Sequence, residues 1–192
     1  VAFTSAYSPS PVCISARCSM IYGQYPHNTN CRENRPMPTD GRRSVMGALT
    51  EAGYRTHGIG KCHFSPDRHA LRGFQSRERQ EEILPAADED DYLPWLHDKG
   101  FGHVSDPHGV RGEMYYIPQV AQMPAELHPT QWVGDRSVAF LDEQPGADQP
   151  WLLYSSFIHP HPPFCPPCPW HKLYRSPLMP LPNVPPDWES LL

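Results

Sequence analysis

Three short segments of the sequence combine residue types that could do chemistry. In the first, Cys13 is followed four residues later by Arg17, within the pentapeptide CISAR. The amide groups at the start of a helix and a nearby guanidinium both stabilise a thiolate or another anion. The segment therefore predicts a reactive cysteine or an anion-binding site. The alternative is a buried cysteine beside a surface arginine.

The second and third segments carry basic side chains at short, regular spacing. Lys61 and His63 are two residues apart, and side chains at that spacing in an extended chain point the same way. They would place a fixed positive charge beside a titratable base. His159 and His161 alternate with prolines, which stiffen the backbone. The alternatives are an ordinary loop for the second segment and a proline-rich crossover with solvent-facing histidines for the third.

Helices and strands are predicted on either side of these segments. The apolar spacing predicts a helix that stops at Gly23, a helix capped by Thr39-Asp40-Gly41, a strand, a third helix and a last strand. Their approximate ranges are residues 13–22, 41–52, 54–60, 130–143 and 151–158. The last strand is almost continuously apolar, which is typical of a strand buried on both faces of a parallel sheet.

The alternation of helices and strands predicts an α/β fold with a mostly parallel sheet flanked by helices. In such sheets, sites gather at the carboxyl ends of the strands. One basic pair, Lys61 and His63, follows the first predicted strand, and His159 and His161 follow the last. Two strands are too few for the helices around them, so we expect the domain to be incomplete.

The remaining parts of the chain give weaker signals. Between residues 77 and 122 the periodicity fades, and the acidic run at 88–91 is most simply a solvated loop. His97, His103 and His108 are predicted to be satisfied or exposed rather than ligands. The segment 160–186 is so rich in proline that we expect an extended loop that lies over other parts of the fold.

Composition and charge exclude several classes of protein. With 192 residues and a formal net charge of −5, the chain is not a basic nucleic-acid binder. No apolar run approaches the ~20 residues that a membrane span needs. The 25 prolines indicate a loop-rich globular protein, and the six cysteines are predicted to be mostly reduced thiols. Cys165 and Cys168 have zinc-like spacing, but two prolines separate them and no second CxxC exists.

Several segments together resemble the signatures of type I sulfatases, in the alkaline phosphatase superfamily. The segments FTSAY, PVCISAR and GQYPH resemble the first signature, and AGYRT followed by GKCHF resembles the second. A later helix and a strand end with the sequence PHPPF are similar to those of bacterial members. These segments lie at residues 3–7, 11–17, 23–27, 52–56, 60–64, 126–141 and 150–167. The resemblance is weakest between residues 74 and 122. It implies that residues 1–192 are a fragment of the N-terminal catalytic α/β domain, without its first strand and its C-terminal half.

The resemblance also implies a role for each residue of the three segments. Cys13 would be oxidised to formylglycine, whose hydrate offers one oxygen to a divalent metal and attacks sulfur with the other. Arg17 would hold the diol, and Lys61 would bridge the diol and the sulfate. His63 would take the proton of the second hydroxyl, and His161 would bind the sulfate and assist the leaving group.

The chain departs from the family pattern at two kinds of position. Ser15 stands where proline is commonest, which bears on how efficiently Cys13 is converted, and Cys62 replaces a common aromatic residue. The paired aspartates and the downstream ligands of the metal have no counterpart, because Asp90 and Asp91 lie in the wrong segment. We therefore expect that Cys13, as formylglycine, is the only metal ligand and that this chain alone is not competent.

The implied function is that of a sulfuric ester hydrolase acting on a small-molecule or glycan sulfate ester. The alternatives are a phosphonate monoester or phosphodiester hydrolase of the same superfamily and a non-catalytic derivative of the fold. The implied cofactor is calcium, or manganese or magnesium, and the implied partner is a formylglycine-generating enzyme. An exposed sheet edge would favour a homo-oligomer. The bacterial cytoplasm and periplasm both remain open.

Overall fold

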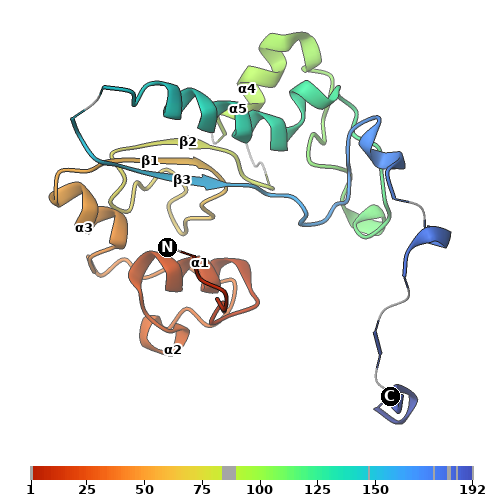
Figure 1. Cartoon of the computed structure of the whole chain (residues 1–192), viewed down its shortest axis with the longest axis horizontal. Helices are drawn as coiled ribbons and strands as arrows, with labels where there is room; N and C mark the ends of the chain where they lie inside the picture. The colour runs from red at the N-terminus through yellow and green to blue at the C-terminus, as the bar shows by residue number, and fades with distance from the viewer. Residues whose placement is uncertain are drawn as a thin grey trace.

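The fold is a small sheet with helices on both faces. The computed structural model describes residues 2–83, 90–146, 148–174, 176–180, 183–184 and 186–191. Figure 1 shows α4 and α5 on one side of the sheet and α1, α2 and α3 on the other, with the C-terminal segment extending away from both. Within the described residues, no helix has both the length and the apolar character needed to cross a membrane.

The sheet consists of three parallel strands in the order β2-β1-β3: β1 (Arg55–Gly60), β2 (Ser76–Arg79) and β3 (Trp151–Ser156). The central strand pairs along its whole length with β3, from Arg55 opposite Trp151 to Gly60 opposite Ser156. Both strands therefore end at the same level, and the segments that follow them leave from the same edge of the sheet. The predicted parallel α/β fold is confirmed.

The helices are short except for the first and the last. They are α1 (Cys13–Tyr22), α2 (Pro26–Thr29), α3 (Val45–Glu51), α4 (Tyr92–Leu96), which continues into a π-helical turn (His97–Phe101), and α5 (Pro129–Asp142). Single 3₁₀ turns lie at Gly112–Met114, Ala125–Leu127, Trp170–Lys172, Ser176–Leu178 and Trp188–Leu191. Much of the remaining chain is irregular, as the high proline content predicts.

Helix α1 has the predicted bounds because its apolar residues share one face. Ile14, Cys18 and Ile21 are buried in a core beneath the sheet, and burial of such a face provides most of the stability of a short helix. The helix ends at Gly23, which adopts the left-handed conformation with φ of 62° that glycine tolerates best. Cys13 is thereby fixed as the first residue of the helix.

A second core on the other face of the sheet fixes α5. Trp132, Val133 and Phe140 pack there together with Ile59 of β1 and Tyr92 of α4. Proline in the first turn and the side chain of His128, which accepts a hydrogen bond from the backbone N of Thr130, start the helix. The predicted helix over residues 130–143 is confirmed.

Some predicted boundaries and environments are wrong. Helix α3 is capped not by residues 39–41 but by Ser44, whose hydroxyl accepts a hydrogen bond from the backbone N of Gly47. Strand β2 was not predicted, because its sequence SRER lacks the apolar alternation of a typical strand. Strand β3 is not buried on both faces: it lies at the edge of the sheet, and only Ser156 among its residues is buried.

The acidic run at residues 88–91 was predicted to be a solvated loop. Residues 88 and 89 lie outside the described residues, and Asp90 does not fit the prediction. Asp90 is only 2% exposed. Its carboxylate accepts hydrogen bonds from the backbone N atoms of Glu81, Tyr92 and Leu93, at 2.8–2.9 Å. Burial raises the pKa of Asp90 to about 6, although these hydrogen bonds favour the charged form. Asp90 therefore joins the end of β2 to the start of α4.

Candidate active site

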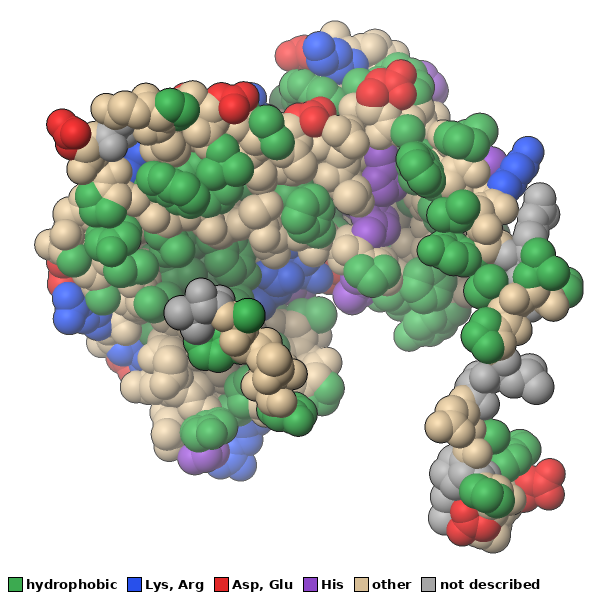
Figure 2. Space-filling model, in the orientation of Figure 1, with side chains coloured by type: hydrophobic (Ala, Val, Ile, Leu, Met, Phe, Trp, Pro, Cys, Tyr) green, Lys and Arg blue, Asp and Glu red, His purple; other side chains and the backbone are tan. Residues whose placement is uncertain are grey.

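A cavity of about 780 Å³ lies between α1 and the carboxyl ends of β1 and β3. Four of the five predicted site residues line it: Cys13, Arg17, Lys61 and His161. In Figure 2, histidine and basic side chains gather near the hollow beside this end of the sheet. The prediction that the basic residues after the two strands meet at one edge is thus confirmed for Lys61 and His161.

Arg17 connects α1 to both neighbouring strand ends. One terminal nitrogen of its guanidinium donates to the Tyr154 hydroxyl at 2.9 Å and to the Ser156 hydroxyl at 3.0 Å. The same nitrogen also donates to the carbonyl oxygen of Lys61. Arg17 is therefore not a surface residue, and its side chain fixes the position of Cys13 relative to the sheet.

Lys61 follows β1 and is 1% exposed. Its ammonium nitrogen lies 4.0 Å from the Cys13 sulfur and 2.9 Å from a carboxylate oxygen of Glu82. A buried ammonium group needs a charged partner, because desolvation without one costs several kcal/mol. Glu82 provides that partner while Lys61 faces the cavity.

His161 shares the Glu82 oxygen with Lys61. Its Nδ1 lies 3.1 Å from that oxygen and 2.6 Å from the carbonyl oxygen of Pro162. Because both neighbours accept hydrogen bonds, Nδ1 carries the proton, and Nε2 is left for a ligand. Burial alone would raise the pKa of Glu82, but the charge and hydrogen bond of Lys61, together with the nearby His161 and His63, outweigh burial and lower the pKa.

His63 does not line the cavity, so the expectation that it points the same way as Lys61 is not met. Its backbone adopts a positive φ of 54°, which breaks the alternation of an extended chain. Its backbone N donates to a Glu81 carboxylate oxygen at 2.8 Å. Burial and the nearby charge of Lys61 lower the pKa of the His63 imidazole to about 4.

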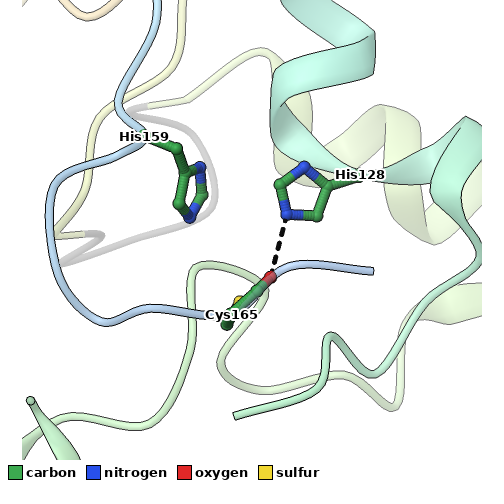
Figure 3. Close-up of side chains that lie close together, drawn as sticks. All are labelled: His128, His159 and Cys165. Carbon is green, nitrogen blue, oxygen red and sulfur yellow. Dashed lines mark hydrogen bonds between the residues drawn. The ribbon is translucent and has the colours of Figure 1, made fainter. Parts of the chain in front are cut away.

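His159 also lies away from this cavity. Its ring stands next to that of His128, with centroids 4.9 Å apart, and close to Cys165. Figure 3 shows the three side chains, with the His128 ring directed at the main-chain oxygen of Cys165. The two histidines of the HPHPP segment therefore belong to different sites.

The sequence did not single out Glu82, Tyr154 or Ser156. Glu82 follows a charged segment whose composition is typical of a solvated surface, and it belongs to no recognisable motif. Tyr154 and Ser156 are at alternate positions of a predicted strand, so they point to one face of the sheet. That spacing is the one signal that could have identified both as neighbours of Arg17.

The described residues do not form a divalent-cation site around Cys13. Calcium and magnesium require several oxygen ligands, usually carboxylates. None of the described residues that line the cavity is an aspartate or glutamate, whereas Arg17 and Lys61 both contribute positive charge. The arrangement suits an anion, with the helix start and two cationic side chains on one side of it.

Comparisons with known proteins match nearly the whole chain. The sulfatase family model matches residues 1–176. The chain is 29% identical over 203 residues to an arylsulfatase of Clostridium perfringens, covering 98% of this chain and 41% of that protein. It is 31% identical over 173 residues to a choline-sulfatase of Rhizobium meliloti, covering 84% of this chain and 31% of that protein.

Solved structures show the same arrangement of elements. A phosphonate monoester hydrolase of Agrobacterium radiobacter superimposes with a TM-score of 0.73 and 22% identity, over 95% of this chain and 38% of that chain. A phosphonate monoester hydrolase of Silicibacter pomeroyi superimposes with a TM-score of 0.66 and 21% identity, over 94% and 38%. At such identities, the likeness is one of fold. The chain spans less than half the length of all four proteins.

Proposed function

Because the chain belongs to the sulfatase family and has its alkaline phosphatase-like α/β fold, we propose that it serves the hydrolysis of sulfate esters. The proposed nucleophile is a formylglycine made from Cys13. The observation that carries the proposal is the meeting of Cys13, Arg17, Lys61 and His161 around one cavity, in a chain that matches the family model. These residue types provide a nucleophile, two cations and a proton carrier.

The proposed first step transfers the sulfuryl group to the protein. One hydroxyl of the hydrated formylglycine gives its proton to water and attacks sulfur through its oxygen. A new S–O bond forms, and the bond from sulfur to the alcohol oxygen breaks. The Nε2 of protonated His161 gives its proton to that leaving oxygen. Lys61 stabilises the charge that builds up on the sulfate oxygens, and Arg17 holds the diol in line with the sulfur.

The proposed second step releases sulfate. The remaining hydroxyl of the diol loses its proton to His63, whose ring lies outside the cavity wall in this structure and must first turn toward Cys13. The C–O bond to sulfate then breaks, and the aldehyde forms again. Water then restores the diol. The low pKa of His63 leaves its imidazole neutral at neutral pH, which is the form that accepts a proton.

Membership of the family also implies a divalent metal, calcium in the first instance, which would stabilise negative charge beside the nucleophile. Cys13, as formylglycine, is the one residue of the described cavity wall that we assign to that metal. None of the described residues that line the cavity offers a carboxylate to hold the ion. The proposed steps therefore do not depend on the ion.

The first test is the mass of the peptide that contains Cys13. Protein produced together with a formylglycine-generating enzyme should show a loss of about 18 Da on that peptide, because an aldehyde replaces the thiol. The peptide with Cys168, which is exposed, is the internal control and should keep its mass. Unmodified Cys13 in the presence of an active generating enzyme would contradict the proposed nucleophile.

The second test is turnover by the converted chain within a protein that spans the length of its relatives, because residues 1–192 alone are not expected to be competent. We expect hydrolysis of an aryl sulfate that is lost in Cys13→Ala and retained in Cys168→Ser. Lys61→Ala should lower kcat/KM by about 10²-fold or more, the loss typical of a removed transition-state donor. Preference for a phosphonate monoester over the aryl sulfate would instead favour the alternative substrate class, and a fully converted but inactive protein would favour a non-catalytic derivative.

A further inference from the structure

A second group of reactive side chains lies where the proline-rich segment crosses the start of α5. One potential ligand atom from each of His128, His159 and Cys165 lies within 4.8 Å of the other two. His128 and Cys165 are buried, and His159 is half-buried. The three side chains come from two segments that are about 30 residues apart in the chain and converge in Figure 3. None of them lines the cavity around Cys13.

The cluster contains polar atoms that lack partners. Among the described residues, the Nε2 of His159 is buried without a hydrogen bond, and Cys165 is a buried cysteine that is not part of a disulfide. Next to them, His108 is 4% exposed, and neither of its ring nitrogens has a hydrogen-bond partner in the part of the chain that the structure describes. Buried nitrogens without partners are rare in folded proteins, because each loses its hydration. A ligand that accepts their lone pairs would remove this penalty.

The loop that carries His108 is tightly packed against the same segment. The rings of His108 and His159 have centroids 6.3 Å apart. A Cβ on Gly109, where φ is +95°, would lie 2.8 Å from Pro163 and 3.1 Å from the Cβ of Cys165. The packing of this loop therefore holds the unpartnered His108 beside the cluster.

Imidazole and thiolate together are the ligands that zinc prefers. We propose that His128, His159 and Cys165 form a zinc site, with His108 beside it, separate from the site at Cys13. Tetrahedral zinc, with bonds of about 2.0–2.3 Å, needs its ligand atoms roughly 3.5 Å apart. The three ligand atoms must therefore approach one another by about 1 Å, which side-chain rotation can provide.

Each ligand changes its bonds in a defined way on binding. The Cys165 thiol gives up its proton and becomes a thiolate, so one proton is released for each zinc bound. His159 offers its unpartnered Nε2. His128 gives up one of its two hydrogen bonds, either from Nε2 to the Cys165 carbonyl (3.1 Å) or from the backbone N of Thr130 to Nδ1 (3.2 Å), so that this nitrogen can bind zinc. All three residues also line a cavity of about 470 Å³, which gives the ion a path in and leaves room for a water as fourth ligand.

The protonation states of the histidines favour this exchange. Burial lowers the pKa of His159 to about 4 and also lowers the pKa of His128. Both rings are therefore neutral at neutral pH, the form that binds metal ions. Because a bound thiol must release its proton, zinc affinity should increase with pH.

The test is metal binding by the purified, reduced and chelator-treated chain. Titration with Co²⁺ should give a thiolate-to-cobalt charge-transfer band at one ion per chain, and Zn²⁺ should displace the cobalt. Cys165→Ser should remove the band and weaken Zn²⁺ binding by about tenfold or more. Cys168→Ser, which changes an exposed cysteine three residues away, is the matched control and should bind as the wild type does.

Two further variants keep the result interpretable. His159→Asn removes a half-buried ligand, so it should weaken Zn²⁺ binding even if Cys165→Ser fails to fold. Cys13→Ser should leave binding unchanged, because Cys13 lies in the other cavity. Zn²⁺ should raise the Tm of the wild type and not that of His159→Asn. The proposal is overturned if the wild type shows no stoichiometric binding, or if His159→Asn binds as tightly as the wild type.

Discussion

At the scale of single residues, the cavity depends on one buried carboxylate. A single oxygen of Glu82 lies 2.9 Å from the Lys61 ammonium and 3.1 Å from Nδ1 of His161. It therefore holds both groups at positions suited to bind an anion. Glu82 also places negative charge close to where sulfate would bind, so a substrate must compete with it for Lys61.

Substitution of Glu82→Gln should destabilise the protein strongly. The change leaves Lys61, which is almost fully buried, without its charged partner. Removal of one member of a buried ion pair typically costs about 3–5 kcal/mol of unfolding free energy. Urea denaturation at pH 7 measures the loss. The double variant Lys61→Met/Glu82→Gln should recover much of it, and a loss below about 0.5 kcal/mol in the single variant would show that the pair is solvated.

The raised pKa of Asp90 should make the stability of the folded protein depend on pH. Its pKa is raised to about 6 in the folded protein, from an ordinary value of 3.8, so between these values the folded state binds more protons than the unfolded state. The wild type should therefore gain stability relative to Asp90→Asn as the pH falls from 6 to 4, by up to about 1.4 kcal/mol per pH unit. Denaturation at pH 4, 5, 6 and 7 measures this difference. A difference that does not vary with pH would contradict the raised pKa.

The residues of the site were predictable to the extent that their types indicate chemistry. Cys13, Arg17, Lys61 and His161 stood out as a nucleophile and basic groups at characteristic spacing, and the structure brings them together. Glu82 acts only through its contacts with two distant residues. No pattern within a single segment could have shown a pairing that requires the folded sheet.

At the scale of elements, the close approach of β1 and β3 depends on Gly60. Its φ is +85°, and a Cβ at this position would lie 2.0 Å from the carbonyl oxygen of Ser156. Both strands end here, so the approach also determines where Lys61 leaves the sheet. A residue with a side chain cannot occupy the position unless the strands separate.

Gly60→Ala should lower the free energy of unfolding by about 3 kcal/mol or more, because it adds backbone strain to a steric clash. The matched control is Gly134→Ala in α5, where a Cβ meets nothing within 4 Å. Alanine has the higher helix propensity, so this control should be neutral or stabilising by up to about 1 kcal/mol. Thermal or urea denaturation compares the two variants. Equal stabilities would mean that the strand ends can move apart freely.

Elements with a clear apolar face were predictable, and charged ones were not. Helices α1 and α5 carry apolar residues at helical spacing, which the two cores bury. Strand β2 has the sequence SRER, and its strand conformation comes from pairing with β1 rather than from its own side chains. The start of α3 was misplaced because several residues before it could cap a helix, and tertiary packing favours Ser44.

At the scale of the whole molecule, the strand order leaves β3 with one unpaired edge in the described part of the chain. Unpaired edges promote association between sheets. Trp151 and Phe157, in and just after β3, are large hydrophobic side chains that are about 40% exposed. The edge therefore combines free backbone groups with apolar surface.

We expect the isolated chain to associate with itself as its concentration increases. Sedimentation velocity over a range of concentrations should show species larger than the monomer. Phe157→Lys should shift the equilibrium toward the monomer, because it adds charge beside the edge. Val138→Lys, at an exposed position of α5, is the control and should not. A monomer at every concentration would contradict the prediction.

The overall class of the fold followed from the alternation of helices and strands, and the family followed from several signatures in the right order. The chain order of the strands, however, does not give their order in the sheet. β1 lies between β2 and β3, and that arrangement brings residues 61 and 161 to one edge. Topology of this kind is determined by long-range packing, which short sequence patterns do not report.

The link from Arg17 to Ser156 also has a consequence for timing during synthesis. The two residues are 139 positions apart, so the contact cannot form until most of the chain has left the ribosome. At about 5–20 residues per second, that delay is on the order of 10 s. Ile14 and Ser15, which are buried in the finished fold, remain accessible during this interval. A maturation enzyme that must grasp the segment around Cys13 therefore has a window whose length is set by the distance along the chain between α1 and β3.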